Sequence, residues 1–129
     1  MAFLGLMTLA CVSLLFYASY QCGMKRGKHS VPAGSIDGPE EFGRYYRAQA
    51  NLLESLMMFL PTVWLLGHFG NMTLASVIAL VYFAGRVMYH LAYTSDDPST
   101  RFKPFVVGVV CTALALVGAL VSIGIRALT

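Results

Sequence analysis

The chain has 129 residues, of which 57% are hydrophobic and only 12% are charged. Soluble domains are roughly a quarter charged, so this composition excludes an ordinary soluble domain and favours a membrane protein of one domain, 1–129. The net charge of +3 is small, and no basic surface interleaved with aromatic residues indicates a nucleic-acid partner.

The first apolar stretch predicts a membrane-spanning helix at about 2–23. Residues 1–24 carry no charged side chain, and about 20 apolar residues are enough for a helix to cross the hydrocarbon core. A signal peptide is the alternative. The stretch lacks a basic start and is longer than the apolar part of such peptides, so we expect a retained first helix.

Two further helices are predicted at about 43–67 and 73–95. Residues 55–85 are uncharged but too long for one span, and the segment GHFGNMT within them is typical of a turn between two helices. Pro39 and the two glutamates that follow it are typical of a helix start. A fourth helix is predicted at about 104–126, in another uncharged stretch.

The basic residues predict how these helices are oriented. The loops after the first and third helices, with the helix ends beside them, hold most of them: Lys25, Arg26, Lys28, Arg44, Arg47, Arg101 and Lys103. The turn between the second and third helices has none. The positive-inside rule therefore places the first and third loops in the cytoplasm and both termini on the opposite side. The sequence predicts an all-α, multi-pass integral membrane protein with a four-helix bundle.

A polar stripe is predicted along one face of the second helix. Its members recur at spacings of three or four residues: Arg44, Arg47, Asn51 and Glu54. Gln49 points to nearly the opposite side. The arginines could reach the headgroups from the helix end. Glu54 lies about three turns in, where a carboxylate is costly and usually faces a protein interior or a wet cavity. We therefore expect Glu54 to pair with an arginine.

The third helix carries a second polar arc: Tyr82, Arg86, Tyr89, His90 and Tyr93. Arg86 is an intramembrane charge and the natural partner for Glu54. The tyrosines could simply be interfacial belt residues, and His90 is expected to pack rather than to bind metal, since no second ligand stands at a suitable spacing. Packing is also the expected role of the cysteines, Cys11, Cys22 and Cys111.

The two polar stripes predict one site that opens toward a single membrane side. Arginine forks match carboxylates, and Glu54 could take an ammonium group, so the site suits an amino acid or a short peptide. Arg101 adds a positive charge near the site mouth. A guanidinium beside a bound thiol would stabilise the thiolate, which is the reactive form. The residues by themselves indicate an anion or peptide site, without specifying the ligand.

Two segments resemble a known family. GPEEFGRYYRAQANLLE, residues 38–54, resembles the signature of the MAPEG family, the membrane-associated proteins of eicosanoid and glutathione metabolism. GRVMYHLAYTSDDPSTR, residues 85–101, is similar to the third-helix region of its glutathione transferase and leukotriene C synthase members. The resemblance covers essentially the whole chain. It implies a homotrimer that holds glutathione as a co-substrate between subunits near the cytosolic face, with no metal.

The resemblance also implies roles for single residues. One subunit would line the glutathione site with Arg47, Asn51, Glu54, Tyr89 and Tyr93. The neighbouring subunit would supply Arg26 and Gln49. Arg101 would activate the thiol, and Arg86 would be a structural charge. Ser55 and Gly27 depart from the leukotriene C synthase pattern, which favours a general, microsomal-type transferase.

The expected function is therefore a glutathione transferase for lipophilic electrophiles, in the manner of a detoxification enzyme, with peroxidase activity on lipid hydroperoxides. A non-catalytic lipid-presenting scaffold, like the lipoxygenase-activating member of the family, is the alternative. A transporter or channel fits poorly because no inverted repeat is visible. Gly118 and Ser122, spaced by four, are expected to contribute to subunit contacts.

Overall fold

Four long helices make up most of the molecule. The structure is a computed structural model that describes residues 1–129 apart from the side chain of Pro98. The helices are α1 (Ala2–Lys28), α2 (Glu40–Leu65), α3 (Met72–Thr94) and α4 (Phe102–Leu128). A π-helical turn, η1 (Leu66–Gly70), follows α2, and a 3-10 turn, η2 (Pro98–Arg101), precedes α4. All four helices are long and apolar enough to cross a membrane, which confirms the predicted all-α fold.

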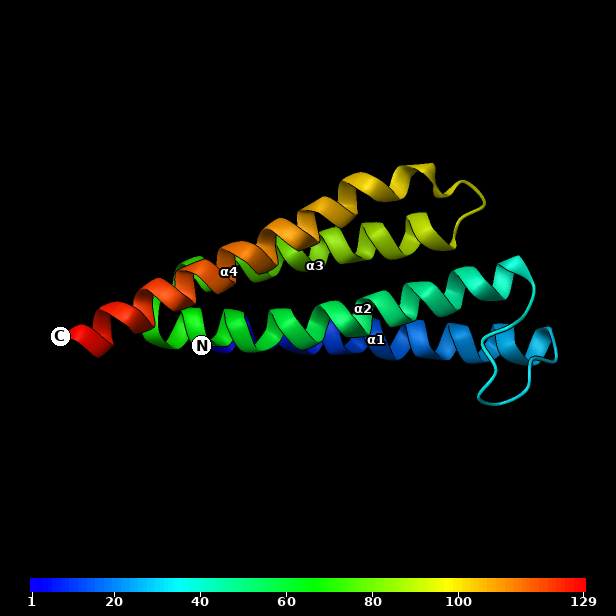
Figure 1. The fold of residues 1–129 in the computed structure, drawn as a ribbon, viewed down its shortest axis with the longest axis horizontal. Coiled ribbons are helices and arrows are strands. Elements are labelled where there is room, and N and C mark those ends of the chain that lie inside the picture. Colours follow the sequence, from blue (N-terminus) through cyan, green and yellow to red (C-terminus); the bar gives the residue numbers. More distant parts are fainter.

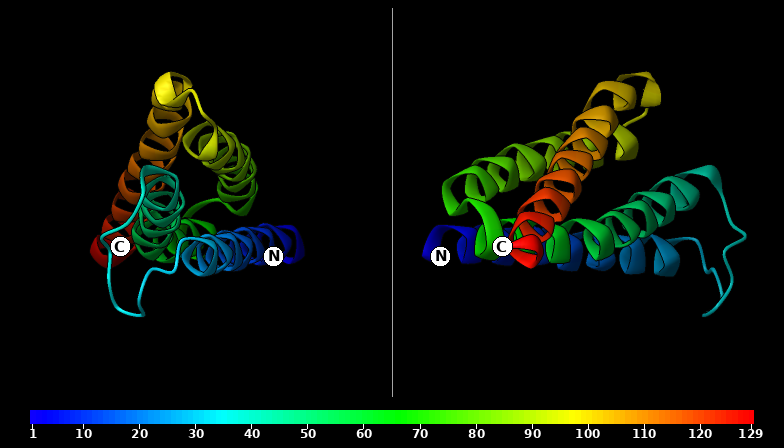
Figure 2. Two further views of the ribbon diagram at one scale, coloured as in Figure 1. Left: turned by 90° about the vertical axis from the view of Figure 1, so that its right-hand side faces the viewer. Right: turned by 60° about the vertical axis from the view of Figure 1, so that its left-hand side comes forward.

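The arrangement puts both chain ends at one end of the bundle and the first and third loops at the other (Figure 1). The α3–α4 pair diverges from the α1–α2 pair toward the loop end (Figures 1 and 2). The two pairs remain in contact nearer the termini, where the core is continuous. The divergence places residues of α2 opposite residues of α3 and α4, and this is where the cavities described below lie.

The helices at the loop end extend beyond their predicted bounds. Helix α1 continues to Lys28, and α2 begins at Glu40. Glu41 joins the two helices because its carboxylate accepts hydrogen bonds from Lys25, from Lys28 at 2.9 Å and from His29 at 2.7 Å. Hydropathy detects only the part of a helix that lies in hydrocarbon, so the charged turn that continues α1 escaped the prediction. The start of α2 at Glu40 is the one that Pro39 and the two glutamates indicated.

Close packing in the bundle centre rests on aromatic stacking and on small residues. Phe59 of α2 and Tyr82 of α3 are both fully buried, and their rings stack with centroids 3.6 Å apart. Helices α3 and α4 approach closely at Gly85, where a Cβ would lie 2.8 Å from the side chain of Val107. Small residues allow this approach between membrane helices, where dispersion contacts provide much of the stability.

Gly118 and Ser122 face the interior of their own chain. A Cβ at Gly118 would lie 2.9 Å from the side chain of Leu66, and one at Gly70 would lie 2.5 Å from the Ser122 hydroxyl. The small residues therefore let α4 pack against η1, while the subunit contact that their spacing predicted stays a prediction. Period-four spacing identifies a close contact without identifying the partner helix.

A hydrogen bond between Trp64 and Thr8 links α2 to α1, with the indole Nε1 donating to the hydroxyl at 3.0 Å. We expect Trp64→Phe to lower the free energy of unfolding by about 1 to 2 kcal/mol, because the hydrogen bond is lost and the phenyl ring is smaller than the indole. Denaturant titration in detergent would measure this. In a double-mutant cycle with Thr8→Val, the double variant should lose less free energy of unfolding than the sum of the two single losses, because both single variants lose the same hydrogen bond; fully additive losses would contradict the link.

Candidate functional site

Three adjoining cavities form a cleft between α2 and the α3–α4 pair. The mouth cavity, about 490 Å³, lies at the loop end, the middle cavity measures about 280 Å³, and the deep cavity measures about 350 Å³. Tyr93 and Arg101 line both the mouth and the middle cavity. Asn51 and Phe105 line both the middle and the deep cavity. The shared walls make the three cavities one path from the loop surface into the bundle.

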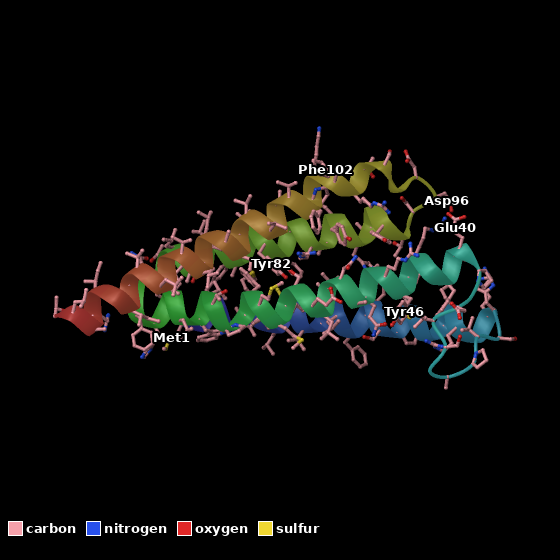
Figure 3. The ribbon with its side chains drawn as sticks, viewed as in Figure 1. Met1, Glu40, Tyr46, Tyr82, Asp96 and Phe102 are labelled. Carbon is pink, nitrogen blue, oxygen red and sulfur yellow. The ribbon has the colours of Figure 1, made fainter. Side chains whose placement is uncertain are left out.

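Three arginines line the mouth cavity, together with the carboxylates of Asp37 and Glu40. Arg44 forms an ion pair with Asp96 of the α3–α4 loop at 3.1 Å. Figure 3 shows Asp96 and Glu40 near each other at the loop end of the two helix pairs. Arg47 is exposed, and the Arg101 guanidinium lies 4.9 Å from the centre of the Tyr93 ring. Among the described side chains, neither Arg47 nor Arg101 has a carboxylate within ion-pair distance. The mouth therefore presents to an incoming anion two cations that no described carboxylate pairs directly.

The turn η2 holds Arg101 at the cleft. Asp97 caps this turn by accepting a hydrogen bond from the backbone amide of Ser99 at 3.0 Å. The hydroxyl and the backbone amide of Ser99 together hold the pKa of Asp97 below its usual value. The carboxylate thus keeps its cap at a lower pH than an ordinary aspartate would, and the cap fixes the backbone from which Arg101 projects.

The middle cavity is built from hydrogen-bonded and aromatic side chains. Asn51 Nδ2 donates a hydrogen bond to the Tyr89 hydroxyl at 2.9 Å, which ties α2 to α3 across the cleft. The rings of Tyr89 and Tyr93 lie 5.4 Å apart, and Phe105 of α4 packs 6.0 Å from Tyr89. Both tyrosines are largely buried, which rules out the interpretation of Tyr89 and Tyr93 as interfacial belt residues.

The deep cavity changes from polar to apolar along its length. Glu54, Ser55 and Arg86 line it together with the apolar residues Met58 and Val109. Both apolar side chains are exposed on the outer surface of the chain, which in a membrane protein faces lipid or another subunit. An apolar molecule dissolved in the bilayer could therefore enter at this end, away from the arginine-lined mouth.

The predicted Glu54–Arg86 pair does not form within the chain. Arg86 instead donates a hydrogen bond to the Ser55 hydroxyl at 2.5 Å, and that hydroxyl is 2.7 Å from the Tyr82 hydroxyl. Glu54 is exposed and lies in the same cavity, but it is absent from the ion pairs among the described residues. The stripe geometry correctly placed both charges on one cavity, but it could not show that the next residue, Ser55, takes the guanidinium.

Six predicted site residues line the cleft: Arg47, Asn51, Glu54, Tyr89, Tyr93 and Arg101. Arg26 and Gln49 line none of the three cavities. Arg26 donates to the backbone carbonyls of Pro32 and Ser35 at 2.6 and 2.8 Å, and Gln49 donates to Ser19 of α1 at 3.0 Å. Their separation from the cleft means that a single chain does not bring all the predicted site residues together.

His90 has the packing role expected for it. Its side chain is buried between α3 and α1, and Nε2 lies 2.7 Å from the Gln21 Oε1 of α1. The Tyr17 ring packs edge-on against the imidazole with centroids 6.1 Å apart. This contact fixes α1 against α3 on the side of the bundle away from the cleft.

Comparison with known proteins identifies relatives over most of the chain. The sequence model of the MAPEG family matches residues 4–121. Human microsomal glutathione S-transferase 2 is 35% identical over 118 residues, which cover 87% of this chain and 80% of the relative. Leukotriene C4 synthase of Cavia porcellus is 35% identical over 126 residues, which cover 98% of this chain and 82% of the relative. An uncharacterized protein of Synechocystis sp. is 32% identical over 119 residues, which cover 92% of this chain and 86% of the relative.

Proposed function

The chain belongs to the MAPEG family, and we propose that it is a membrane-bound glutathione transferase. It binds glutathione as a co-substrate, ionises the thiol and conjugates the thiolate to lipophilic electrophiles. The same thiolate reduces lipid hydroperoxides. The observation that carries the proposal is the change along the cleft from an arginine-lined mouth to an apolar deep cavity. Such a cleft suits a small anionic peptide at one end and a molecule from the bilayer at the other.

Glutathione is assigned to the mouth and middle cavities, with its ammonium group reaching Glu54 where the deep cavity begins. Arg47 has no ion-pair partner among the described side chains, and its fork matches a carboxylate of the peptide. Glu54, equally unpaired, accepts the ammonium group. Asn51 and the two buried tyrosines between these charges supply hydrogen-bonding groups that fix the bent peptide. Both ends of the ligand thereby meet a charge of opposite sign.

Arg101 is assigned the activation of the thiol. Its guanidinium lies over Tyr93, at the boundary between the mouth and the middle cavity. A cation beside the sulfur lowers the pKa of the thiol and raises the fraction of thiolate at neutral pH. The thiolate then attacks the electrophilic atom of a molecule that reaches the middle cavity from the deep cavity, and the sulfur–carbon bond forms as the leaving group departs.

The working unit in this proposal is a homotrimer with a site between subunits. Arg47 and Glu54 are both exposed on the single chain, so a neighbouring subunit has room to cover the glutathione site. Arg26 and Gln49 would come from that neighbour. The first and third loops, which frame the mouth cavity, face the cytoplasm according to the positive-inside rule, where glutathione is available.

Mixing the purified, detergent-solubilised protein with glutathione tests the proposal. We expect saturable binding by calorimetry and the ultraviolet absorbance of a thiolate at neutral pH. Oxidised glutathione, which has no thiol, is the matched control and should give no thiolate signal. Binding without thiolate would move thiol activation away from this site. A complete absence of binding would contradict the transferase and favour the lipid-presenting scaffold.

A further inference from the structure

Arg86 is a buried cation without a carboxylate partner. Its side chain is 4% exposed, and it lies eight residues, or about 12 Å, before the end of α3. Among the described side chains it forms no ion pair, and its Nε is buried without a hydrogen-bond partner. Its one side-chain hydrogen bond goes to Ser55. A charge this deep in a membrane is costly, so it usually serves a function.

The surrounding residues hold the Arg86 guanidinium at the wall of the deep cavity. The rings of Tyr82 and Tyr89 lie 5.3 and 5.5 Å from its central carbon. The backbone of α4 passes close at Gly108, where a Cβ would come within 2.7 to 2.9 Å of three guanidinium atoms. A glycine is needed at this position for the guanidinium to remain where it is. The group is therefore preorganised, with hydrogen-bond donors to spare.

We propose that Arg86 is a catalytic residue that donates a hydrogen bond to the oxygen of a carbonyl electrophile. The substrates are lipophilic α,β-unsaturated aldehydes and ketones, with the carbonyl at Arg86 and the alkyl chain along Met58 and Val109. This role rests on the proposed glutathione transferase activity. The deep cavity adjoins the middle cavity through Asn51 and Phe105, so an electrophile held at Arg86 lies beside the cavity that Arg101 and the assigned thiolate line.

The chemical step balances without any further reactant. The thiolate adds to the β-carbon, a sulfur–carbon bond forms, and the alkene electron pair moves to give an enolate. The negative charge gathers on the carbonyl oxygen, where the Arg86 guanidinium stabilises it. A proton from solvent then adds to the α-carbon. This uptake balances the proton that glutathione released when its thiol ionised. The product is the saturated thioether, and nothing is oxidised or reduced in the net addition of glutathione.

A carbonyl oxygen suits Arg86 better than a carboxylate does, because the charge on a carbonyl oxygen grows during the reaction. A carboxylate would pair with the Arg86 guanidinium equally well in the bound substrate and in the transition state, which lowers KM without raising kcat. A carbonyl oxygen carries little charge until the transition state, so Arg86 stabilises the transition state more than the bound substrate.

Two variants test this role with two electrophiles, a long-chain 2-alkenal and an alkyl halide of equal chain length. Arg86→Gln removes the cation. Gly108→Ala keeps Arg86 but moves its flexible guanidinium, and Gly124→Ala on the same helix, where a Cβ meets nothing within 4 Å, is the control. We expect Arg86→Gln to lower kcat/KM for the alkenal about a hundredfold and Gly108→Ala about tenfold, with less than about threefold change for the halide.

The thiolate absorbance of glutathione is recorded on the same preparations. A normal thiolate signal with a selective loss of alkenal turnover supports the role. Equal losses with both electrophiles would make Arg86 structural, and unchanged alkenal turnover in both variants would remove it from the reaction. If the unaltered protein forms no thiolate, the proposed function itself is contradicted, and the role of Arg86 with it.

Discussion

Replacing Arg101 with alanine should lower the rate of glutathione conjugation by about a hundredfold to a thousandfold, with less than about a threefold change in glutathione affinity. The guanidinium lies over Tyr93, at the boundary between the mouth and middle cavities, where the thiol is assigned. Its charge is expected to act on the ionised sulfur far more than on the bound peptide, since Arg47 and Glu54 are assigned the main charges for binding. The loss should therefore fall on kcat and on the thiolate absorbance.

The pH dependence of the reaction separates this explanation from a loss of folding. Without the Arg101 cation the pKa of the bound thiol rises, so the variant should regain rate as the pH increases toward the pKa of free thiols, about 8.5. Lys103→Ala is the matched control, because Lys103 is a nearby exposed cation that lines none of the three described cavities. An Arg101→Ala protein that conjugates as fast as its parent at neutral pH would exclude thiol activation by this residue.

Much of the fold could be predicted from the sequence because a membrane imposes strict physical conditions. Uncharged stretches of about 20 residues have few stable structures other than a spanning helix. The charged ends were less predictable. The three contacts of Glu41 with Lys25, Lys28 and His29 depend on how α1 meets α2, which no local pattern encodes.

The site was predictable where one helix determines it and less so where several helices meet. Helical spacing placed Asn51 and Glu54 on one face of α2, and both line the cleft. The partner of Arg86 was missed because a buried cation was expected to pair with an anion, and Glu54 was the anion nearby. The hydroxyl of Ser55 accepts the hydrogen bond instead. A signal was present, because Ser55 follows Asn51 by four residues and so continues the polar stripe.

Arg26 and Gln49 raise a different difficulty, because their predicted role requires a second subunit. Within one chain Arg26 holds the first loop through two carbonyls, and Gln49 joins α2 to α1. Both residues are thus on the α1 side of α2, whereas Arg47, Asn51 and Glu54 line the cleft on its other side. A site that uses both sides of α2 is possible only if one subunit places its α1 side against the cleft of the next.

Mixed trimers provide a decisive test of this shared site. Arg47→Ala removes a residue assigned to the cleft of one subunit, and Gln49→Ala removes one assigned to its neighbour. Each variant alone should lose most glutathione binding, because every site in its trimer lacks one group. When both are co-expressed and assemble at random, about one site in four joins a subunit that keeps Arg47 to one that keeps Gln49, and that fraction of binding should return.

Combining both substitutions in one chain provides the control for the mixed trimers. When the double variant assembles with the unaltered chain, about one site in four again has both groups, so the two mixtures should recover similar amounts of binding. Mixing the two single variants after purification, without exchange of subunits, should restore nothing. If each site lay within one chain, the co-expressed single variants would recover no glutathione binding. The mixture of the double variant with the unaltered chain would then recover about half of the binding. A site between subunits and a site within one chain therefore differ in whether the co-expressed single variants bind glutathione at all. Calorimetry on tagged, co-purified trimers would measure this.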